Sequence, residues 1–213
     1  MNAAAPAGLS RAERLRRGWH MLPGLLPVVL WFVPHADPVS PTLRLIAFAV
    51  LISIAATVAV RWRRVARRAD EPGTASVLGY AGSVALLLTV LPGHAECAFA
   101  VLGVLAFGDG SATLVGKSLG GPRLPWNREK SLAGFAAFIA VGVPMTALLY
   151  WGERTNPEAL DGPVTPATAW AVACAGVLPA AVSESVDSAV NDNVRVGLTA
   201  VVCVVAAHFA WAA

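Results

Sequence analysis

Residues 94–117 read HAECAFAVLGVLAFGDGSATLVGK, an apolar run that ends in a glycine-rich stretch with one acid and one lysine. The apolar part is suited to lipid, whereas a carboxylate at mid-membrane costs roughly 2.5–3.5 kcal/mol on insertion scales. Asp109 and Lys117 are therefore expected either to have a functional role or to be in contact with water.

The composition of the whole chain is that of a membrane protein. Of its 213 residues, 56% are hydrophobic and only 14% are charged, and the mean hydropathy is +0.63. A soluble domain is nearer a quarter charged. We expect an all-α integral membrane protein with one membrane-embedded domain over residues 1–213, of which 1–15 form a flexible N-terminal tail. Cys97, Cys174 and Cys203 lie in apolar runs and are expected to be buried thiols.

Hydrophobic segments and basic residues predict the topology. About seven apolar runs alternate with polar connections, and a helix needs about 20 residues to cross the hydrocarbon core. With a cytoplasmic N-terminus, 14 of the 16 lysines and arginines fall on one face, and only Arg44 and Arg154 on the other. This bias indicates that the basic face is cytoplasmic, and basic flanks of spans explain the net charge of +3 without nucleic acid. The predicted spans are 20–34, 43–60, 75–92, 94–108, 131–151, 165–182 and 194–212.

The glycine-rich stretch is the first of three candidate polar clusters. If the fourth span continues as a helix, Asp109, Thr113 and Lys117 share one face, with about 12 Å between the first and the last. The carboxylate could hold Mg²⁺ and the lysine a phosphate, while Gly110 and Gly116 would let a backbone or ligand approach closely. The spacing from Gly110 to Gly116 is one residue too long for a P-loop, and no strand-forming run precedes it. The alternative is that the glycines pack helices and Asp109 caps one.

The second and third clusters are loops predicted on the same face. The loop 122–131 contains two prolines and ends in Lys130 and Ser131, where Ser131 could cap the fifth span and the pair could bind an anion. Its alternative is a loop whose bases touch lipid headgroups. Residues 183–193 carry Glu184, Asp187 and Asp192, an oxygen-rich surface suited to Mg²⁺ and to accepting a hydroxyl proton. Its alternative is a solvated loop.

Other polar residues lie at the ends of predicted spans. Arg17 and His20 begin the first span, where arginines are normally topology anchors. His94, Glu96 and His208 lie near the opposite ends of their spans and are expected at the membrane interface.

The order of these motifs resembles that of the polyprenol kinase family, which includes phytol and farnesol kinases, dolichol kinases and CTP-dependent diacylglycerol kinases. The motifs are Arg-Arg-x-x-His at 16–20, Gly-Asp-Gly-Ser-Ala at 108–112, Leu-Pro-Trp-Asn-x-x-Lys-Ser-Leu-Ala-Gly at 124–134, and Ser-Glu-Ser…Asn-Asp-Asn at 183–193. The 124–134 string is most similar to the phytol kinase branch. The resemblance implies a membrane enzyme that phosphorylates a lipid alcohol, typically with CTP. Asp109, Lys117, Lys130, Ser131, Glu184, Asp192 and Asn193 fall on the family's motif positions.

Residue chemistry and resemblance lead to one functional hypothesis. CTP or another nucleoside triphosphate binds with Mg²⁺ at the cytoplasmic face, and a lipid alcohol such as phytol, geranylgeraniol, farnesol or diacylglycerol attacks the γ-phosphorus. In a bacterium, the membrane would be the plasma or inner membrane. The expected catalytic residues are Asp109, Glu184 and Asp187, and the expected Mg²⁺ ligands are Asp109, Glu184 and Asp192. The expected nucleotide and phosphate contacts are Arg17, His20, Gly110, Gly116, Lys117, Lys130, Ser131 and Asn193.

Two other functions remain open from the sequence. A CTP:phosphatidate cytidylyltransferase would also bind CTP and a lipid, but would release pyrophosphate where a kinase releases CDP. A small membrane transporter would require acids and bases at mid-span depth and on both faces, whereas the predicted clusters gather on one face.

Overall fold

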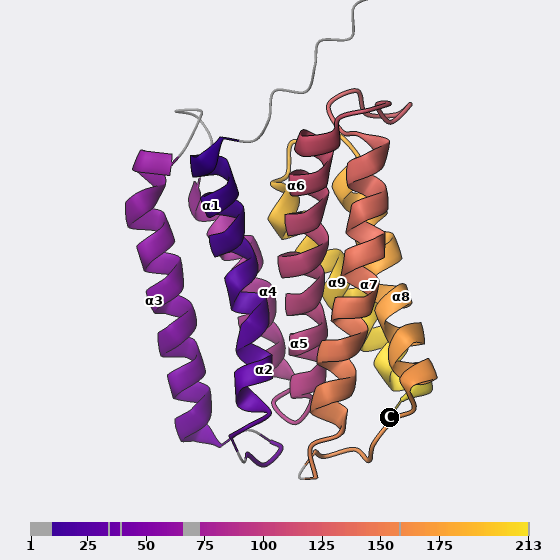
Figure 1. The fold of residues 1–213 in the computed structure, drawn as a ribbon. Coiled ribbons are helices and arrows are strands. Elements are labelled where there is room, and N and C mark those ends of the chain that lie inside the picture. Colours follow the sequence, from indigo (N-terminus) through magenta and orange to yellow (C-terminus); the bar gives the residue numbers. More distant parts are fainter. Residues whose placement is uncertain (1–9, 34, 39, 66–72, 158, 213) are drawn as a thin grey trace, which may run out of the picture.

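Long helices lie side by side and alternate in direction along the chain (Figure 1). In this computed structural model the described residues are 10–33, 35–38, 40–65, 73–157 and 159–212. The expected tail lies outside them as far as residue 9, and the first helix begins at Arg11. The elements are α1 (Arg11–Met21), η1 (Leu22–Leu25), α2 (Leu26–Leu30), α3 (Pro41–Val65), α4 (Gly73–Val90), α5 (Ala95–Gly103), η2 (Val104–Asp109), α6 (Gly110–Leu119), α7 (Leu132–Arg154), α8 (Pro166–Ser185) and α9 (Asp192–Trp211).

The all-α prediction is confirmed for the described part of the chain, which contains no strand beyond an isolated bridge between Arg123 and Ser131. Four helical segments are long and apolar enough to cross a membrane: Ala95–Leu119, Leu132–Arg154, Pro166–Ser185 and Asp192–Trp211. Each of the seven predicted apolar runs lies mainly on helix in its described residues, but the count of seven spans and the cytoplasmic N-terminus stay predictions.

The central helix of the bundle is the one that carries the glycine-rich stretch. It runs from Ala95 to Leu119 through α5, η2 and α6, so it continues past the end predicted at residue 108. Every residue from 95 to 112 is buried, and α4, α7 and α9 pack around it. Its middle segment η2 is a π-helix that ends at Asp109. Single-turn π segments inside α-helices are frequent at functional sites.

A pair of glycines lets α6 and α7 approach closely. A Cβ on Gly134 would lie 2.8 Å from the backbone oxygen of Ala112, and one on Gly116 would lie 2.9 Å from Oγ of Ser131. Only glycine fits both positions without a shift of backbone or side chain. This contact fixes the loop between α6 and α7 against the end of the central helix.

The connections gather at two ends of the bundle (Figure 1). The start of α1, the α6–α7 loop and the α8–α9 loop lie at one end, which we call the α1 end. The α4–α5 loop, the α7–α8 loop and the C-terminus lie at the other, which we call the C-terminal end. Each end contains a cluster of buried polar side chains.

Candidate functional site

Asp109 is the buried acid of the α1 end. Its residue is 7% exposed, and Oδ2 lies 3.1 Å from Nε2 of His20 and 3.8 Å from Nη1 of Arg17, both on α1. Nε2 of His20 also lies 3.1 Å from the carbonyl oxygen of Leu105. Because both neighbours of this nitrogen are oxygen acceptors, Nε2 carries the proton and donates. The Tyr80 hydroxyl donates to the His20 carbonyl at 3.2 Å, which holds this part of α1 in place.

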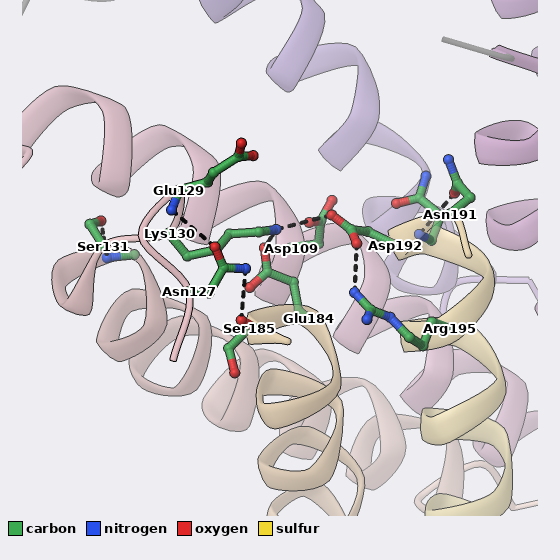
Figure 2. Close-up of polar contacts among 12 residues, drawn as sticks. Asp109, Asn127, Glu129, Lys130, Ser131, Glu184, Ser185, Asn191, Asp192 and Arg195 are labelled. Carbon is green, nitrogen blue, oxygen red and sulfur yellow. Dashed lines mark hydrogen bonds and ion pairs between the residues drawn. The ribbon is translucent and has the colours of Figure 1, made fainter. Parts of the chain in front are cut away.

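Lys130 joins the second and third predicted clusters. Its Nζ lies 2.5 Å from Oε1 of Glu184, at the end of α8, and 3.0 Å from Oδ2 of Asp192, at the start of α9 (Figure 2). Arg195, one turn further along α9, donates to Oδ1 of Asp192 at 2.7 Å. Burial alone would lower the pKa of Lys130, but the carboxylates of Glu184 and Asp192 outweigh it and raise that pKa above its ordinary value. Lys130 is therefore a fixed positive charge.

Hydrogen bonds attach the α6–α7 loop to the end of α8. Asn127 donates through Nδ2 to the Ser185 carbonyl at 3.0 Å and accepts from the Glu129 backbone amide at 2.9 Å (Figure 2). Trp126 donates through Nε1 to Oγ of Ser185 at 3.1 Å. Ser131 caps α7, because its Oγ accepts from the Gly134 amide at 3.1 Å, as its position in the sequence predicts. These contacts place Lys130 between the two acids.

The two groups of contacts form one electrostatic site. The Lys130 ammonium stabilises the charge on Asp109, and the Asp109 and Glu184 carboxylates are close enough to repel one another. Glu184 is buried at 6% exposure. Three carboxylates from three helices therefore face a lysine, two arginines and a histidine. Carboxylate oxygens are the ligands that Mg²⁺ takes in proteins, and fixed cations suit phosphate oxygens.

Other predicted residues lie elsewhere at this end. Lys117 is exposed near the end of α6, and Asp187 is exposed in the α8–α9 loop. Asn193 lies in the first turn of α9, where its backbone amide donates to Oδ1 of Asn191, the N-cap residue. A Cβ on Gly110 would lie 2.5 Å from Cγ of Met21, so the close approach at this glycine is made by α1. At Gly116 the close approach is made by α7.

Sequence reasoning missed two features of the molecule. Arg195 was counted only as a basic flank, although its position three residues after Asp192 on a helix places the two side chains together. His94, Glu96 and His208 were expected at the membrane interface, which stays a prediction, but sequence reasoning did not expect them to lie together. Glu96 is 2% exposed and His208 is fully buried. They belong to the cluster at the C-terminal end.

Fold and site together define a helical protein with four described helical segments long and apolar enough to cross a membrane, and with a buried site of opposite charges at one end. Among curated proteins, the chain is similar to a soybean (Glycine max) protein described as probable phytol kinase 3, chloroplastic. The two are 28% identical over 129 residues, which cover 58% of this chain and 38% of the relative. No family model and no solved structure matches the chain. The similarity is thus to a probable phytol kinase at low identity, and the chain spans less than half the length of this relative.

Proposed function

We propose that this protein is a membrane kinase that transfers the γ-phosphate of CTP, or of another nucleoside triphosphate, to the hydroxyl of a lipid alcohol. The observation that carries the proposal is the convergence of Asp109, Lys130, Glu184 and Asp192 at one end of a helical membrane bundle. The similarity to a phytol kinase supports it independently. The candidate acceptors are phytol, geranylgeraniol, farnesol and diacylglycerol.

The basic residues of the α1 end would bind the triphosphate. Phosphoryl transfer depends mainly on positioning and on neutralising the phosphate oxygens. Arg17, Lys117 and Lys130 are the candidates, and the bonds from Asn127 and Trp126 to α8 hold Lys130 in place. Lys130 now pairs with two carboxylates, so an arriving phosphate would compete with them for its ammonium.

The acids of the site fit Mg²⁺. Asp109, Glu184 and Asp192 offer hard oxygen ligands, and the mutual repulsion of Asp109 and Glu184 is the kind that a bound divalent cation relieves. When bound, Mg²⁺ would neutralise charge on the transferred phosphoryl group. His20 and Arg17 hold Asp109 in one orientation, and a carboxylate of this group would accept the proton of the acceptor hydroxyl.

The lipid substrate would reach the site from the bilayer. Leu15 and Trp19 on α1, the helix that carries Arg17 and His20, and Leu22 at the start of η1 are exposed, at 56%, 62% and 49% exposure. Their spacing of four and three residues places them along one helix face. An apolar stripe beside a polar site is the surface that an amphipathic alcohol requires, with its chain in lipid and its hydroxyl at the charges.

The test is a product analysis with purified protein. The protein in detergent is supplied with CTP or ATP, Mg²⁺ and each lipid alcohol in turn, and both the lipid and the nucleotide products are identified. The proposal predicts a lipid monophosphate together with a nucleoside diphosphate, lost on chelation of Mg²⁺. Pyrophosphate with a cytidyl lipid would establish the cytidylyltransferase instead. No lipid product with any donor or acceptor would overturn both.

A further inference from the structure

The C-terminal end of the bundle holds a second polar cluster, far from the candidate kinase site (Figure 1). Four residues form its centre: His94 just before α5, Glu96 in the first turn of α5, Asp161 in the α7–α8 loop, and His208 in the last turn of α9. One ligand atom from each lies within 4.8 Å of the others. We propose that these four side chains bind a divalent transition metal ion of the Zn²⁺ type.

Three of the six distances between ligand atoms fit the edges of a tetrahedral site, and all six are within 4.8 Å. His94 Nδ1 lies 3.3 Å from Oε1 of Glu96 and 3.3 Å from Oδ2 of Asp161, and His208 Nε2 lies 3.4 Å from the same Asp161 oxygen. Zn²⁺ bonds of about 2.0–2.1 Å at tetrahedral angles require ligand atoms roughly 3.3 Å apart. Two imidazoles with two carboxylates suit Zn²⁺ and its neighbours in the transition series better than Mg²⁺ or Ca²⁺.

His208 supplies a second, independent observation. The residue is fully buried, and its Nε2 has no hydrogen-bond partner among the described residues; Oδ2 of Asp161 lies 3.4 Å from it. Its other ring nitrogen, Nδ1, lies 2.8 Å from the hydroxyl of Tyr150. Histidines that bind metals commonly engage the second nitrogen in this way, which fixes the ring and leaves the first nitrogen for the ion.

The charge balance also calls for a cation. Glu96 and Asp161 meet one guanidinium, that of Arg154, whose Nη1 lies 2.8 Å from Oδ2 of Asp161 and 3.6 Å from Oε1 of Glu96. Glu153, a further acid at this end, is fully buried, and its Oε1 lies 2.8 Å from Nε2 of His35. Glu96, which is buried, and Asp161, which is partly exposed, therefore share the single guanidinium of Arg154, and uncompensated buried charge is strongly unfavourable. A divalent ion would supply the missing positive charge.

The experiment measures metal binding directly and does not depend on kinase activity. Purified full-length protein in detergent is stripped with EDTA, and Co²⁺ or Zn²⁺ is titrated in excess Mg²⁺, with Co²⁺ followed by its ligand-field absorption. We expect one ion per chain, a tetrahedral Co²⁺ spectrum, and a metal-dependent rise in the melting temperature. His94→Gln and Asp161→Asn should weaken binding at least about tenfold, and Tyr150→Phe by about tenfold or more.

The control variants locate the ion. Cys174→Ser removes a thiol outside the cluster and should leave the affinity unchanged, as should Glu184→Gln at the other end of the bundle. Asp161→Asn changes a loop residue that is partly exposed, so the variant should still fold and should elute from a sizing column at the volume of wild type. Absence of stoichiometric metal would overturn the proposal and leave Arg154 as the counterion of the cluster. Wild-type affinity in both His94→Gln and Asp161→Asn, or binding lost only in Glu184→Gln, would also overturn it.

Discussion

Replacement of Lys130 by methionine should show that its ion pair with Glu184 contributes more free energy than its ion pair with Asp192. The change removes the ammonium and keeps a side chain of similar length. Glu184 has an 8% exposed side chain, so it would be left as a buried carboxylate without its cation. Asp192 has a 45% exposed side chain and keeps its bond from Arg195, so it would lose little.

The magnitudes follow from these exposures. A hydrogen bond to a buried charged group contributes about 1.5–3 kcal/mol, whereas an exposed ion pair contributes about 0.2–1 kcal/mol. We therefore expect a coupling free energy of about 1.5–3 kcal/mol between Lys130 and Glu184, and under about 1 kcal/mol between Lys130 and Asp192. At about 2–4 °C per kcal/mol for a chain of this size, Lys130→Met should lower the melting temperature by roughly 3–12 °C.

The assay is a pair of double-mutant cycles on thermal unfolding in one detergent. Lys130→Met is combined with Glu184→Gln in one cycle and with Asp192→Asn in the other, so each pair is isolated from other effects of the substitution. Equal couplings, or a larger one with Asp192, would refute the geometry. Because the folded pKa of Lys130 is raised, its stabilising effect is complete below 10.5 and is lost only as pH rises through the folded pKa. Both couplings should therefore be the same at about pH 7 and pH 9.

Three further predictions concern single residues. Asp187→Asn should change lipid phosphorylation by less than about threefold, because the side chain is exposed; a loss like that of a buried acid would return Asp187 to the site. Gly134→Val should cost about 1–3 kcal/mol of stability, since its Cβ would meet a backbone oxygen of α6, whereas Gly162→Ala, with open space around it, should cost little. Burial, with the charge of Glu153, raises the pKa of Asp37 from 3.8 to about 7. The folded chain thus keeps this proton to higher pH than the unfolded chain. The stability of wild type should therefore fall relative to that of Asp37→Asn as pH rises between these two values. A difference in melting temperature between the two proteins that does not change with pH would contradict this.

The sequence predicts the helical fold well because its strongest signal is hydrophobic length. Each apolar run lies mainly on helix, and the P-loop alternative was rightly excluded, since the residues from Gly110 to Leu119 form a helix with no strand before it among the described residues. The ends of elements were less predictable. The fourth span was bounded at 108 with its continuation as a helix left open, and the helix runs on to Leu119, where α7 packs closely on α6 through Gly116 and Gly134.

The candidate site was predicted as three separate clusters. Which of their residues contact one another could be learned only from the fold. Residue types indicated that Lys130 and Glu184 both handle charge, but nothing in their spacing of 54 residues indicates a direct bond. The contact of His20 with Asp109 is of the same kind, since the two are separated by a whole pass through α3 and α4. Long-range contacts such as these depend on the order in which helices pack.

The C-terminal end shows where the sequence argument failed. The polar clusters were expected on one face, since 14 of the 16 lysines and arginines fall there, and Asp161 was assigned to no cluster. The structure folds the α7–α8 loop back onto the bundle, so that Asp161 reaches His94 and Arg154. A residue that is buried by a loop belongs to no hydrophobic periodicity in the sequence, so its burial could not be predicted.

Transfer of labelled phosphate from CTP carrying ³²P at the γ-position to a lipid alcohol tests the central claim most directly. Purified wild type should label the lipid, and Asp109→Asn and Glu184→Gln should each lower the rate by roughly a hundredfold or more. Glu129→Gln is the matched control, because it changes an exposed acid at the same end of the bundle and should leave the rate unchanged. Undiminished labelling by Asp109→Asn and Glu184→Gln, or no labelling by wild type with either CTP or ATP as the labelled donor, would contradict a phosphoryl-transfer site at the α1 end.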